Sequence, residues 1–398
     1  MEKPELEDPH IRIEHIKLKE LSDFARKALS HPDFHSVKPI SLIRAQAQTK
    51  NPHAHPDDVA LLVAFYKNRC VAYHGLLPGL LKGAGNFSRV YWLVTFFVSP
   101  DYRKKGMGKL LVKEIQGLGA DLVTTGITKA AEAVYRSMGF KPLGELAFVQ
   151  LRLDRLPFPG AFFRNLLQYL ENNKNRLNKF YLFFNKLDSR MHTTAKKIFY
   201  RSVFSRLNWE EKRFSCRRVA YLSERFESAA DDNPGPPLFF RGIKAINWML
   251  QHRWVVSRHE EKGGTENYYF STVRDLFKYI ALEIYSADEK SAKGFSVYSV
   301  SRKKGRTSVK ILDCHFSDPS DNHIAAYFGL KYAKEFLADR IEFPEHLAGF
   351  FINRLSLPKL VKKKKRLYLF CPSSADSPLA VSAPEITLDY CDSDTAFT

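Results

Sequence analysis

The sequence predicts an α/β (α+β) fold in which a mixed sheet is flanked by helices, in two related domains joined by a basic helical segment. Strand-length runs rich in β-branched and aromatic residues alternate with segments of helical periodicity in both halves of the chain. The order hairpin, helix, strand, helix, strand occurs in each half, which indicates a degenerate structural repeat. At 398 residues, the chain is also longer than one ordinary domain.

The first half begins with an alternating stretch and continues with strands and helices. A hairpin is expected across Lys67–Arg69, between two of the strands. The expected elements are an alternating stretch at Ile11–Leu18, a helix through Leu21–Leu29, strands at Val59–Tyr66, Cys70–Leu76 and Arg89–Val98, a helix at Gly108–Leu118, a strand at Asp121–Thr125, a helix at Lys129–Met138 and a strand at Leu146–Leu153.

The second half restarts a similar alternation of elements. The expected elements are helices at Ile243–Gln251 and Val273–Ser286, a hairpin from Phe295–Ser301 to Val309–Phe316, a helix at His323–Leu337, a strand at Arg340–Phe343, a helix at His346–Leu355 and a strand at Arg366–Cys371.

A basic, aromatic-rich segment separates the two halves. Between Arg155 and Phe226 there are 16 Lys and Arg against 5 Asp and Glu, and apolar residues recur at helical spacing. This predicts two or three amphipathic helices, whose apolar faces join the two domains or lie on an anionic membrane surface. The run Asp231–Pro237 marks the end of the segment. We therefore expect domains at 1–154 and 238–398, with residues 155–237 as the linker.

Composition indicates a folded protein of a reducing compartment. The chain is 44% hydrophobic and 13% aromatic, and its five cysteines are scattered without a paired spacing. The N-terminus lacks the apolar core of a signal peptide, and the longest apolar stretches have only strand length, so a cytoplasmic location is expected. The net charge of +19 favours anionic partners: a nucleotide cofactor, phospholipid headgroups, nucleic acid or an acidic glycan.

The most informative stretch is an R-x-x-G-x-G pattern formed by Arg103, Gly106 and Gly108, between a predicted strand and a predicted helix. Glycines let the backbone approach an anion closely, and the free N–H groups of a first helical turn point toward it. Arg103, Lys104 and Lys105 add positive charge, so a pyrophosphate is the expected ligand. The similar Arg302–Thr307 stretch leads into a strand, and it is not expected to bind phosphate.

A second stretch, Ala131–Phe140, places Tyr135 one turn before Gly139-Phe140 at the end of a predicted helix. Over roughly residues 11–153, the two stretches together resemble the GNAT superfamily of N-acetyltransferases. The resemblance implies that acetyl-CoA is the co-substrate, that no metal is needed, and that Tyr135 donates a proton to the departing CoA thiolate. It also implies that the pantetheine arm is bound by Phe96, Phe97 and Val98, and the pyrophosphate by Arg103, Lys104, Lys105, Gly106, Met107, Gly108 and Lys109.

The sequence does not single out a general base, because the strand Tyr91–Val98 contains no carboxylate. His74, or His53 and His55 in the preceding loop, could serve, whereas Glu132 is expected to face solvent. His53 and His55 with Asp57 and Asp58 would also suit a metal ion, although such clusters are commonly solvated turns. No base is assigned, and no metal is expected.

The second half lacks a comparable glycine turn, since the acidic stretch Phe316–Asn322 follows its central strand and would repel a pyrophosphate. We expect this half to have lost CoA binding, and to shape the acceptor cleft or to support the first domain. The tail Asp389–Asp394 could supply a carboxylate, bind a cation or form a solvated terminus. The basic run Lys362–Arg366 is expected to precede a strand in an exposed loop, or to touch an anionic surface.

The resemblance implies an acyl-CoA-dependent acyltransferase that moves an acetyl group to an amine or hydroxyl by direct attack in a ternary complex. Its acceptor is expected to be a small molecule or glycan, with peripheral contact to an anionic membrane surface as a further option and nucleic acid disfavoured. Two other functions stay open: an aminoacyl transferase of the FemABX type, and a non-enzymatic protein that docks on an anionic membrane or nucleic acid. The acceptor and the oligomeric state have no signature in the sequence.

Overall fold

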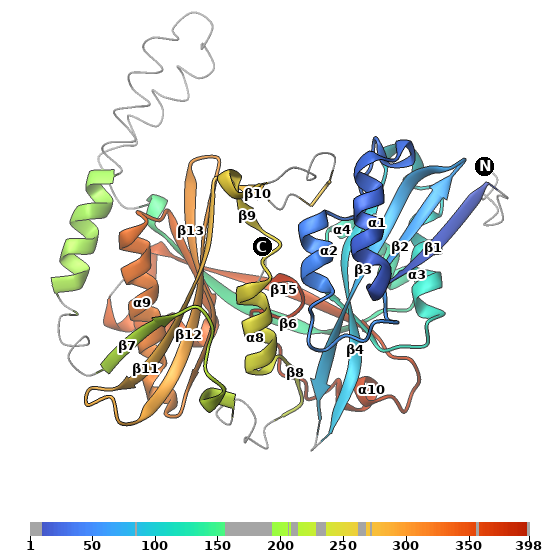
Figure 1. Ribbon diagram of the computed structural model, residues 1–398. Coiled ribbons are helices and arrows are strands. Elements are labelled where there is room, and N and C mark those ends of the chain that lie inside the picture. The colour runs from blue at the N-terminus through green and yellow to red at the C-terminus, as the bar shows by residue number, and fades with distance from the viewer. Residues whose placement is uncertain are drawn as a thin grey trace, which may run out of the picture. The chain divides into compact units, whose positions relative to one another are not determined.

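The computed structural model describes residues 10–83, 86–155, 193–205, 207, 214–227, 236–261, 268–270, 273–355 and 358–395 (Figure 1). The chain divides into two compact units that are interleaved along the sequence. The first unit comprises Met1–Ala147, Val219–Lys278 and Lys365–Thr398, and the second comprises Phe148–Arg218 and Tyr279–Lys364. The contiguous division at 154 and 237 that the sequence suggests therefore differs from the grouping of the compact units.

The first unit contains a sheet with helices on both faces. Its elements are β1 (Ile11–Lys17), α1 (Leu18–Ser30), α2 (Leu42–Gln48), β2 (Val59–Tyr66), β3 (Arg69–Lys82), β4 (Phe87–Val98), α3 (Met107–Gln116), β5 (Leu122–Thr125), α4 (Lys129–Ser137) and the start of β6 (Lys141–Arg152). Later segments add β8 (Leu238–Phe240), α8 (Gly242–Gln251), β9 (Val256–Ser257), β10 (Val273–Arg274), the end of β15 (Val361–Cys371) and α10 (Pro378–Ser382).

Strands β1, β2, β3 and β4 are antiparallel neighbours, and β4 then runs parallel to β5. A parallel pair requires a crossover, which α3 provides. The β2–β3 hairpin closes through Lys67 and Asn68, both at positive φ, as a two-residue turn of type I′ requires. One apolar core packs α1 and α2 against the sheet, and a second packs α3 and α4 against the other face (Figure 1).

The second unit repeats this plan. Its elements are the end of β6, a helix over residues 193–205, β7 (Phe214–Val219), β11 (Leu276–Ser286), β12 (Ala292–Lys303), β13 (Arg306–Phe316), α9 (Asn322–Glu335), β14 (Arg340–Pro344) and the start of β15. Strands β12 and β13 form an antiparallel hairpin, and β13 runs parallel to β14 after the α9 crossover. The predicted repeat of hairpin, helix and strand is therefore present.

Each unit completes its sheet with a strand from the other half of the sequence. In the first unit, the last residues of β15 pair antiparallel with β5. In the second unit, the last residues of β6 pair antiparallel with β14. The two halves of the sequence thus exchange strands, and neither sheet is built from one contiguous stretch.

Several expected elements differ from the structure. Val273–Ser286 was expected as a helix but forms β10 and β11. The prediction failed because β11 is buried on both faces from Ile280 to Tyr285 and therefore lacks the alternation that identifies a strand. In place of the expected helix at His346–Leu355 there is a 3₁₀ turn, Glu345–Leu347, followed by a π-helical turn, Phe350–Arg354.

The expected helices of the basic segment lie mostly outside the described residues, which omit 156–192 and 208–213. The described part contains the helix at 193–205 and the strand β7. Within the described residues, no helix is both long and apolar enough to cross a membrane.

A β-bulge interrupts β4 where it passes His74 on β3. The register shifts by one residue between Tyr73 and Gly75, and Thr95 on β4 takes a φ of +50°. A Cβ atom added to Gly75 would lie 2.5 Å from the Thr95 hydroxyl oxygen, so the bulge needs a glycine at this point.

We expect Gly75→Ala to destabilise the protein by about 1–3 kcal/mol, because the new methyl group overlaps the Thr95 side chain. Chemical denaturation would measure the loss. The matched control is Gly83→Ala, where an added Cβ would have its nearest neighbour at 3.8 Å. Adding Thr95→Gly to Gly75→Ala should restore much of the stability, and a Gly75→Ala protein as stable as the wild type would contradict this description.

Candidate active site

The candidate site begins at the bulged end of β4. Strand β4 pairs with β5 only over Tyr91–Leu93, opposite Leu122–Thr124. From Val94 to Val98, β4 pairs with β3 alone, and in the described part of the chain no strand pairs with its other edge. This leaves backbone donors and acceptors along an extended edge where a chain-like ligand could add hydrogen bonds. The predicted pantetheine residues Phe96, Phe97 and Val98 all lie on this edge, and their side chains are half-buried.

The R-x-x-G-x-G turn follows β4 directly. A 3₁₀ turn at Pro100–Tyr102 leads to Lys104 at a φ of +62° and Gly106 at a φ of +81°, and Gly106 is the N-cap of α3. The first bond within this end of the helix runs from the Leu110 N–H to the Gly106 carbonyl, and no side chain caps the helix. The N–H groups of Met107, Gly108 and Lys109 therefore have no acceptor among the described residues. Free amides at a helix start attract anions.

Positive charge surrounds these amides. Arg103, Lys104, Lys105 and Lys109 are exposed at the turn. The Arg103 Nε donates to the Val98 carbonyl over 3.1 Å, which ties the turn to the end of β4. Space is also available, since nothing lies within 4 Å of a Cβ built on Gly106. Backbone amides, charge and open space together fit a diphosphate.

Tyr135 lies on the buried face of α4. The helix ends in a Schellman motif at Gly139, with bonds from the Phe140 N–H to the Tyr135 carbonyl and from the Gly139 N–H to the Arg136 carbonyl. This turn brings the Phe140 ring to 5.0 Å from the Tyr135 ring. The predicted glycine cap is therefore confirmed, and it fixes the tyrosine in place.

The structure brings His74 and Tyr135 together. The His74 Nε2 lies 2.7 Å from the Tyr135 hydroxyl oxygen, and the His74 Nδ1 lies 3.1 Å from the Gly75 carbonyl. A carbonyl only accepts, so Nδ1 carries the proton and the bare Nε2 accepts the Tyr135 O–H. Both side chains have no solvent exposure. The pair is thus a tyrosine that donates to a neutral histidine.

Burial keeps both members of the pair uncharged. Burial lowers the pKa of His74 to about 4, although hydrogen bonds to the Gly75 and Val94 backbone oppose the shift. Burial also raises the pKa of Tyr135 above its usual value, against a smaller effect of the Thr124 hydroxyl. At neutral pH the Tyr135 hydroxyl therefore retains its proton.

Phe96 connects the tyrosine pair to the glycine turn. Its ring stacks on His74 with centroids 4.7 Å apart, and it lies 5.7 Å from the Tyr135 ring. On its other side, a Cβ added to Gly108 would lie 3.0 Å from the tip of the Phe96 ring. One aromatic side chain thus sets the spacing between the start of α3 and the His74–Tyr135 pair.

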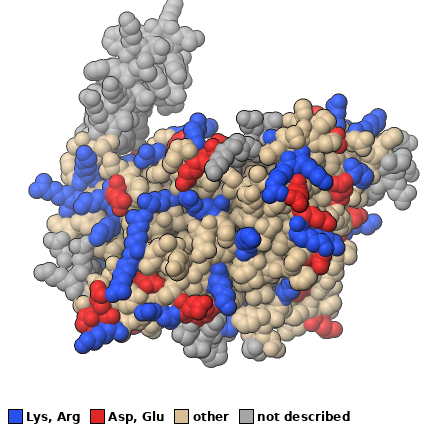
Figure 2. Space-filling model, viewed as in Figure 1, with Lys and Arg blue, Asp and Glu red and all other residues tan. Residues whose placement is uncertain are grey.

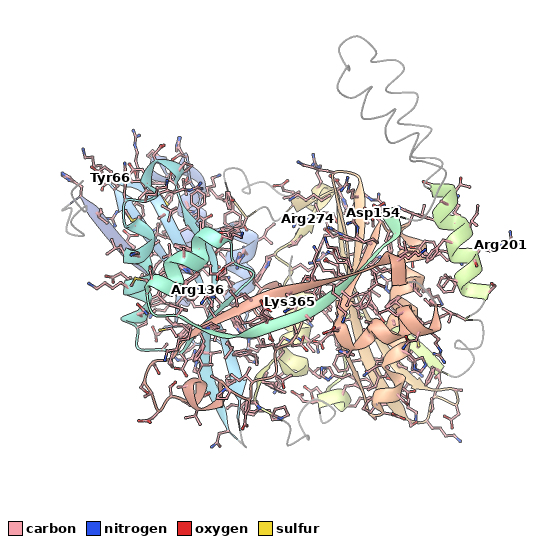
Figure 3. All side chains as sticks on the ribbon, turned by 180° about the vertical axis from the view of Figure 1, so that it is seen from behind. Tyr66, Arg136, Asp154, Arg201, Arg274 and Lys365 are labelled. Atoms are coloured by element: carbon pink, nitrogen blue, oxygen red, sulfur yellow. The ribbon has the colours of Figure 1, made fainter. Side chains whose placement is uncertain are left out.

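The other candidate bases lie in different surroundings. Burial lowers the pKa of His53 to about 4. His55 forms a local turn, in which its Nδ1 accepts from the Asp57 N–H over 3.3 Å. Glu132 is paired with Arg136 at 2.8 Å along α4, whose position Figure 3 marks by the Arg136 label. None of these three hydrogen-bonds Tyr135.

The suggested metal cluster has other partners. Asp57 binds Lys19 at 2.6 Å, and Asp58 binds Arg89 and the Tyr91 hydroxyl. Among the described residues, no group of His, Cys, Asp and Glu side chains is arranged to hold a metal ion.

The acidic tail is docked in the first unit. Asp394 pairs with the buried Arg44 at 3.1 Å, and Asp389 pairs with Arg241 at 3.0 Å. The Asp392 carboxylate, only 2% exposed, accepts from the Asp389 N–H over 2.7 Å, and burial raises its pKa. The interpretation as a solvated terminus is therefore wrong for Asp389–Asp394.

The basic run Lys362–Arg366 lies within β15 rather than in a loop before a strand. Lys363 pairs with Glu345, and Lys365 pairs with Glu145 at 2.7 Å; Figure 3 labels Lys365 on this strand. On the face drawn in Figure 2, basic and acidic side chains are interspersed.

The sequence indicated both His74 and Tyr135 but not their contact, and it missed Gly75 and Thr95. An isolated glycine within a strand-like run is a signal of a bulge or a close backbone approach, and Gly75 carries that signal.

Comparisons with known proteins find a matching domain model and similar folds. Residues 57–142 match the model of an acetyltransferase (GNAT) domain, whereas no curated protein sequence matches the chain. A GCN5-related N-acetyltransferase from Anabaena variabilis superposes with a TM-score of 0.50 at 10% identity, over 92% of this chain and 73% of its own.

Two further solved structures have lower scores. An N-myristoyltransferase from Saccharomyces cerevisiae with bound myristoyl-CoA has a TM-score of 0.48 at 11% identity, and the alignment covers 93% of this chain and 81% of that one. A tandem GNAT protein from the clavulanic acid biosynthesis pathway has a TM-score of 0.45 at 11% identity, over 92% and 99%. The superposition on the Anabaena protein shows a GNAT-like fold, and residues 57–142 match a GNAT acetyltransferase domain.

Proposed function

We propose that the first unit is an acyl-CoA-dependent N- or O-acyltransferase that moves an acetyl group from acetyl-CoA to a small-molecule or glycan acceptor. The observation that carries the proposal is the turn before α3, where three free backbone amides lie among four exposed cationic side chains. The GNAT domain match over the same residues supports it.

Two features of the first unit support this proposal, one for the pyrophosphate and one for the pantetheine arm. The amides of Met107, Gly108 and Lys109 suit the pyrophosphate. The edge at Phe96–Val98, which no described strand covers, suits the pantetheine arm, although the Val98 carbonyl already accepts from the Arg103 Nε. The co-substrate supplies a thioester carbonyl that a neutral amine or hydroxyl attacks directly.

Tyr135 would act as the proton donor to the departing sulfur. Its raised pKa keeps the hydroxyl protonated at neutral pH, so that a proton is present to give. His74 is a positioning residue in this proposal: its bare Nε2 holds the Tyr135 hydroxyl in place, and the O–H must turn away from Nε2 to give its proton to sulfur. A histidine with a pKa of about 4 is a weak base, which argues against His74 as the group that deprotonates the acceptor.

The proposal is tested by incubating the full chain with acetyl-CoA and a metabolite extract, and by identifying acetylated products with mass spectrometry. Parallel reactions with octanoyl-CoA and myristoyl-CoA test the choice of acyl group, since faster transfer of a long chain would overturn the acetyl assignment. Turnover of aminoacyl-tRNA would favour the FemABX-type alternative. Salt-sensitive binding to liposomes or DNA without any affinity for CoA would favour a non-enzymatic docking protein.

Charge reversal at the turn should weaken co-substrate binding. We expect Lys105→Glu to raise the Kd for acetyl-CoA roughly tenfold or more, a loss of about 1.4 kcal/mol or more. The matched control is Lys113→Glu in the last turn of α3, also exposed, with an expected change below about twofold. Isothermal titration calorimetry would measure both, and equal effects of the two substitutions would contradict the pyrophosphate assignment.

Removing the Tyr135 hydroxyl should slow turnover and spare binding. We expect Tyr135→Phe to lower kcat by about 10²–10⁴-fold with little change in acetyl-CoA affinity. Release of CoA thiol in the presence of the acceptor would report the rate. Tyr91→Phe, which removes a hydroxyl bonded to Asp58 over 2.8 Å, controls for the loss of a tyrosine hydrogen bond that is part-buried. A Tyr135→Phe enzyme with the wild-type kcat would refute the role of proton donor.

The low pKa of His74 also makes a prediction about stability. Between about pH 6.5 and 4, the unfolded chain binds a proton at His74 that the folded chain does not, so stability falls as pH falls through this window. For this residue, the slope is at most about 1.4 kcal/mol per pH unit. We expect urea unfolding of His74→Gln to show a smaller dependence on pH here than the wild type. If the free energy of unfolding of the two proteins changed equally with pH, His74 would not be the source of the pH dependence.

A further inference from the structure

A cavity in the second unit has the chemistry of a ligand site separate from the site described above. It has a volume of about 410 Å³ and lies between α9 and the strands β7 and β11, which Figure 1 labels. Volumes of this size are typical of small-molecule sites. No step of the proposed acyl transfer uses these residues.

One wall comes from a single face of β7. Side chains alternate along a strand, so Phe214, Cys216 and Arg218 share the face that lines the cavity. The opposite face carries Ser215 and Arg217, and both bond the Glu289 carboxylate. Glu289 therefore neutralises Arg217 and leaves Arg218, which has no ion pair in the described part of the chain.

The second wall is a stripe along α9. Ile324, Phe328 and Lys331 recur at the three- and four-residue spacing that places side chains on one helix face. Leu282 from β11 adds to the apolar surface. The Lys331 Nζ lies 5.5 Å from the centre of the Phe328 ring, so its charge lies beside the apolar part of the cavity.

The charges of the cavity have one sign. Arg218 and Lys331 are both exposed, and none of the described residues that line the cavity is acidic. The charge of Arg218 reaches the cavity, because it opposes the effect of burial that raises the pKa of Tyr332, another lining residue, to about 12; Glu335, which does not line the cavity, adds a smaller effect of the opposite sign. A cationic rim over an apolar floor is complementary to an anionic group on an apolar body.

We propose that this cavity binds an amphipathic carboxylate, with its apolar body against Phe214, Leu282 and Phe328 and its charged group between Arg218 and Lys331. A flexible aliphatic carboxylate such as decanoate is the probe of this chemistry. Decanol has the apolar body without the charge, and inorganic phosphate has the charge without the apolar body, so the two probes test each contribution to binding separately.

The test is a calorimetric titration of the full chain with decanoate, decanol and inorganic phosphate. We expect saturable decanoate binding, with decanol and phosphate each at least about tenfold weaker. Arg218→Gln should raise the decanoate Kd about tenfold, and Arg217→Gln, the neighbour on the opposite face of β7, should change it less than about twofold. No saturable decanoate binding, equal binding of decanol, tighter binding of phosphate, or equal effects of the two substitutions would each overturn the proposal.

The cysteines supply a second readout that needs no substitution. Cys216 lines the cavity, whereas Cys314 on β13 does not. Decanoate should slow the alkylation of Cys216 by iodoacetamide at least about threefold, as measured by peptide mass spectrometry, and should leave the rate at Cys314 unchanged. Unchanged alkylation of Cys216 at saturating decanoate would place the ligand elsewhere and overturn the assignment.

Discussion

The close approach of β3 and β4 at Gly75 and Thr95 is the constraint on which the candidate site depends. Because Gly75 has no side chain, the Thr95 hydroxyl can lie over it, and β4 can accommodate one extra residue. From the bulge onward, β4 pairs with β3 alone in the described structure and keeps an open edge. Phe96 and Thr95 are the two bulge residues opposite His74, and the Phe96 ring lies between His74 and the start of α3. The open edge begins at this local distortion, and Phe96 contacts both the His74–Tyr135 pair and the start of α3.

The direction of the Tyr135–His74 hydrogen bond limits the catalytic roles that these two residues can have. Its geometry and burial both specify a neutral histidine that accepts, and a tyrosine that donates. A histidine in this state orients a hydroxyl well but has little tendency to take a proton near pH 7. Another group or a water molecule must therefore deprotonate the acceptor, whether the acceptor is an amine or a hydroxyl. A neutral histidine of low pKa is unsuited to general base catalysis, whereas the Tyr135 hydroxyl carries a proton at neutral pH, although burial makes it a weaker acid.

The sequence predicted the parts of the fold that depend on local chemistry. The turn predicted at Lys67–Arg69 and the helix end predicted at Gly139 are both present, and both contain residues at positive φ. Gly106 lies in the predicted turn before α3, although the helix begins at Met107 and was expected from Gly108. The prediction failed at β11, where burial on both faces removes the alternation that identifies a strand. The contact of His74 with Tyr135 joins residues 61 positions apart, and no local pattern encodes such a pairing. The candidate site residues were recognised individually, but the bulge that positions them was not.

Because the two halves exchange strands, the first unit depends on segments from the second half of the sequence. The edge of β5 is covered by β15, whose residues lie about 245 positions further along the chain. A chain ending near residue 154 would lack this strand, and it would expose the edge of β5 together with its unpaired backbone groups. It would also lose the contact of the Trp248 indole N–H, on α8, with the Ala47 carbonyl on α2. The second half of the sequence is therefore structurally necessary to the first unit, even though its own counterpart of the glycine turn is acidic. Retention of this half requires no catalytic role for it, because it completes the sheet on which the candidate site is built.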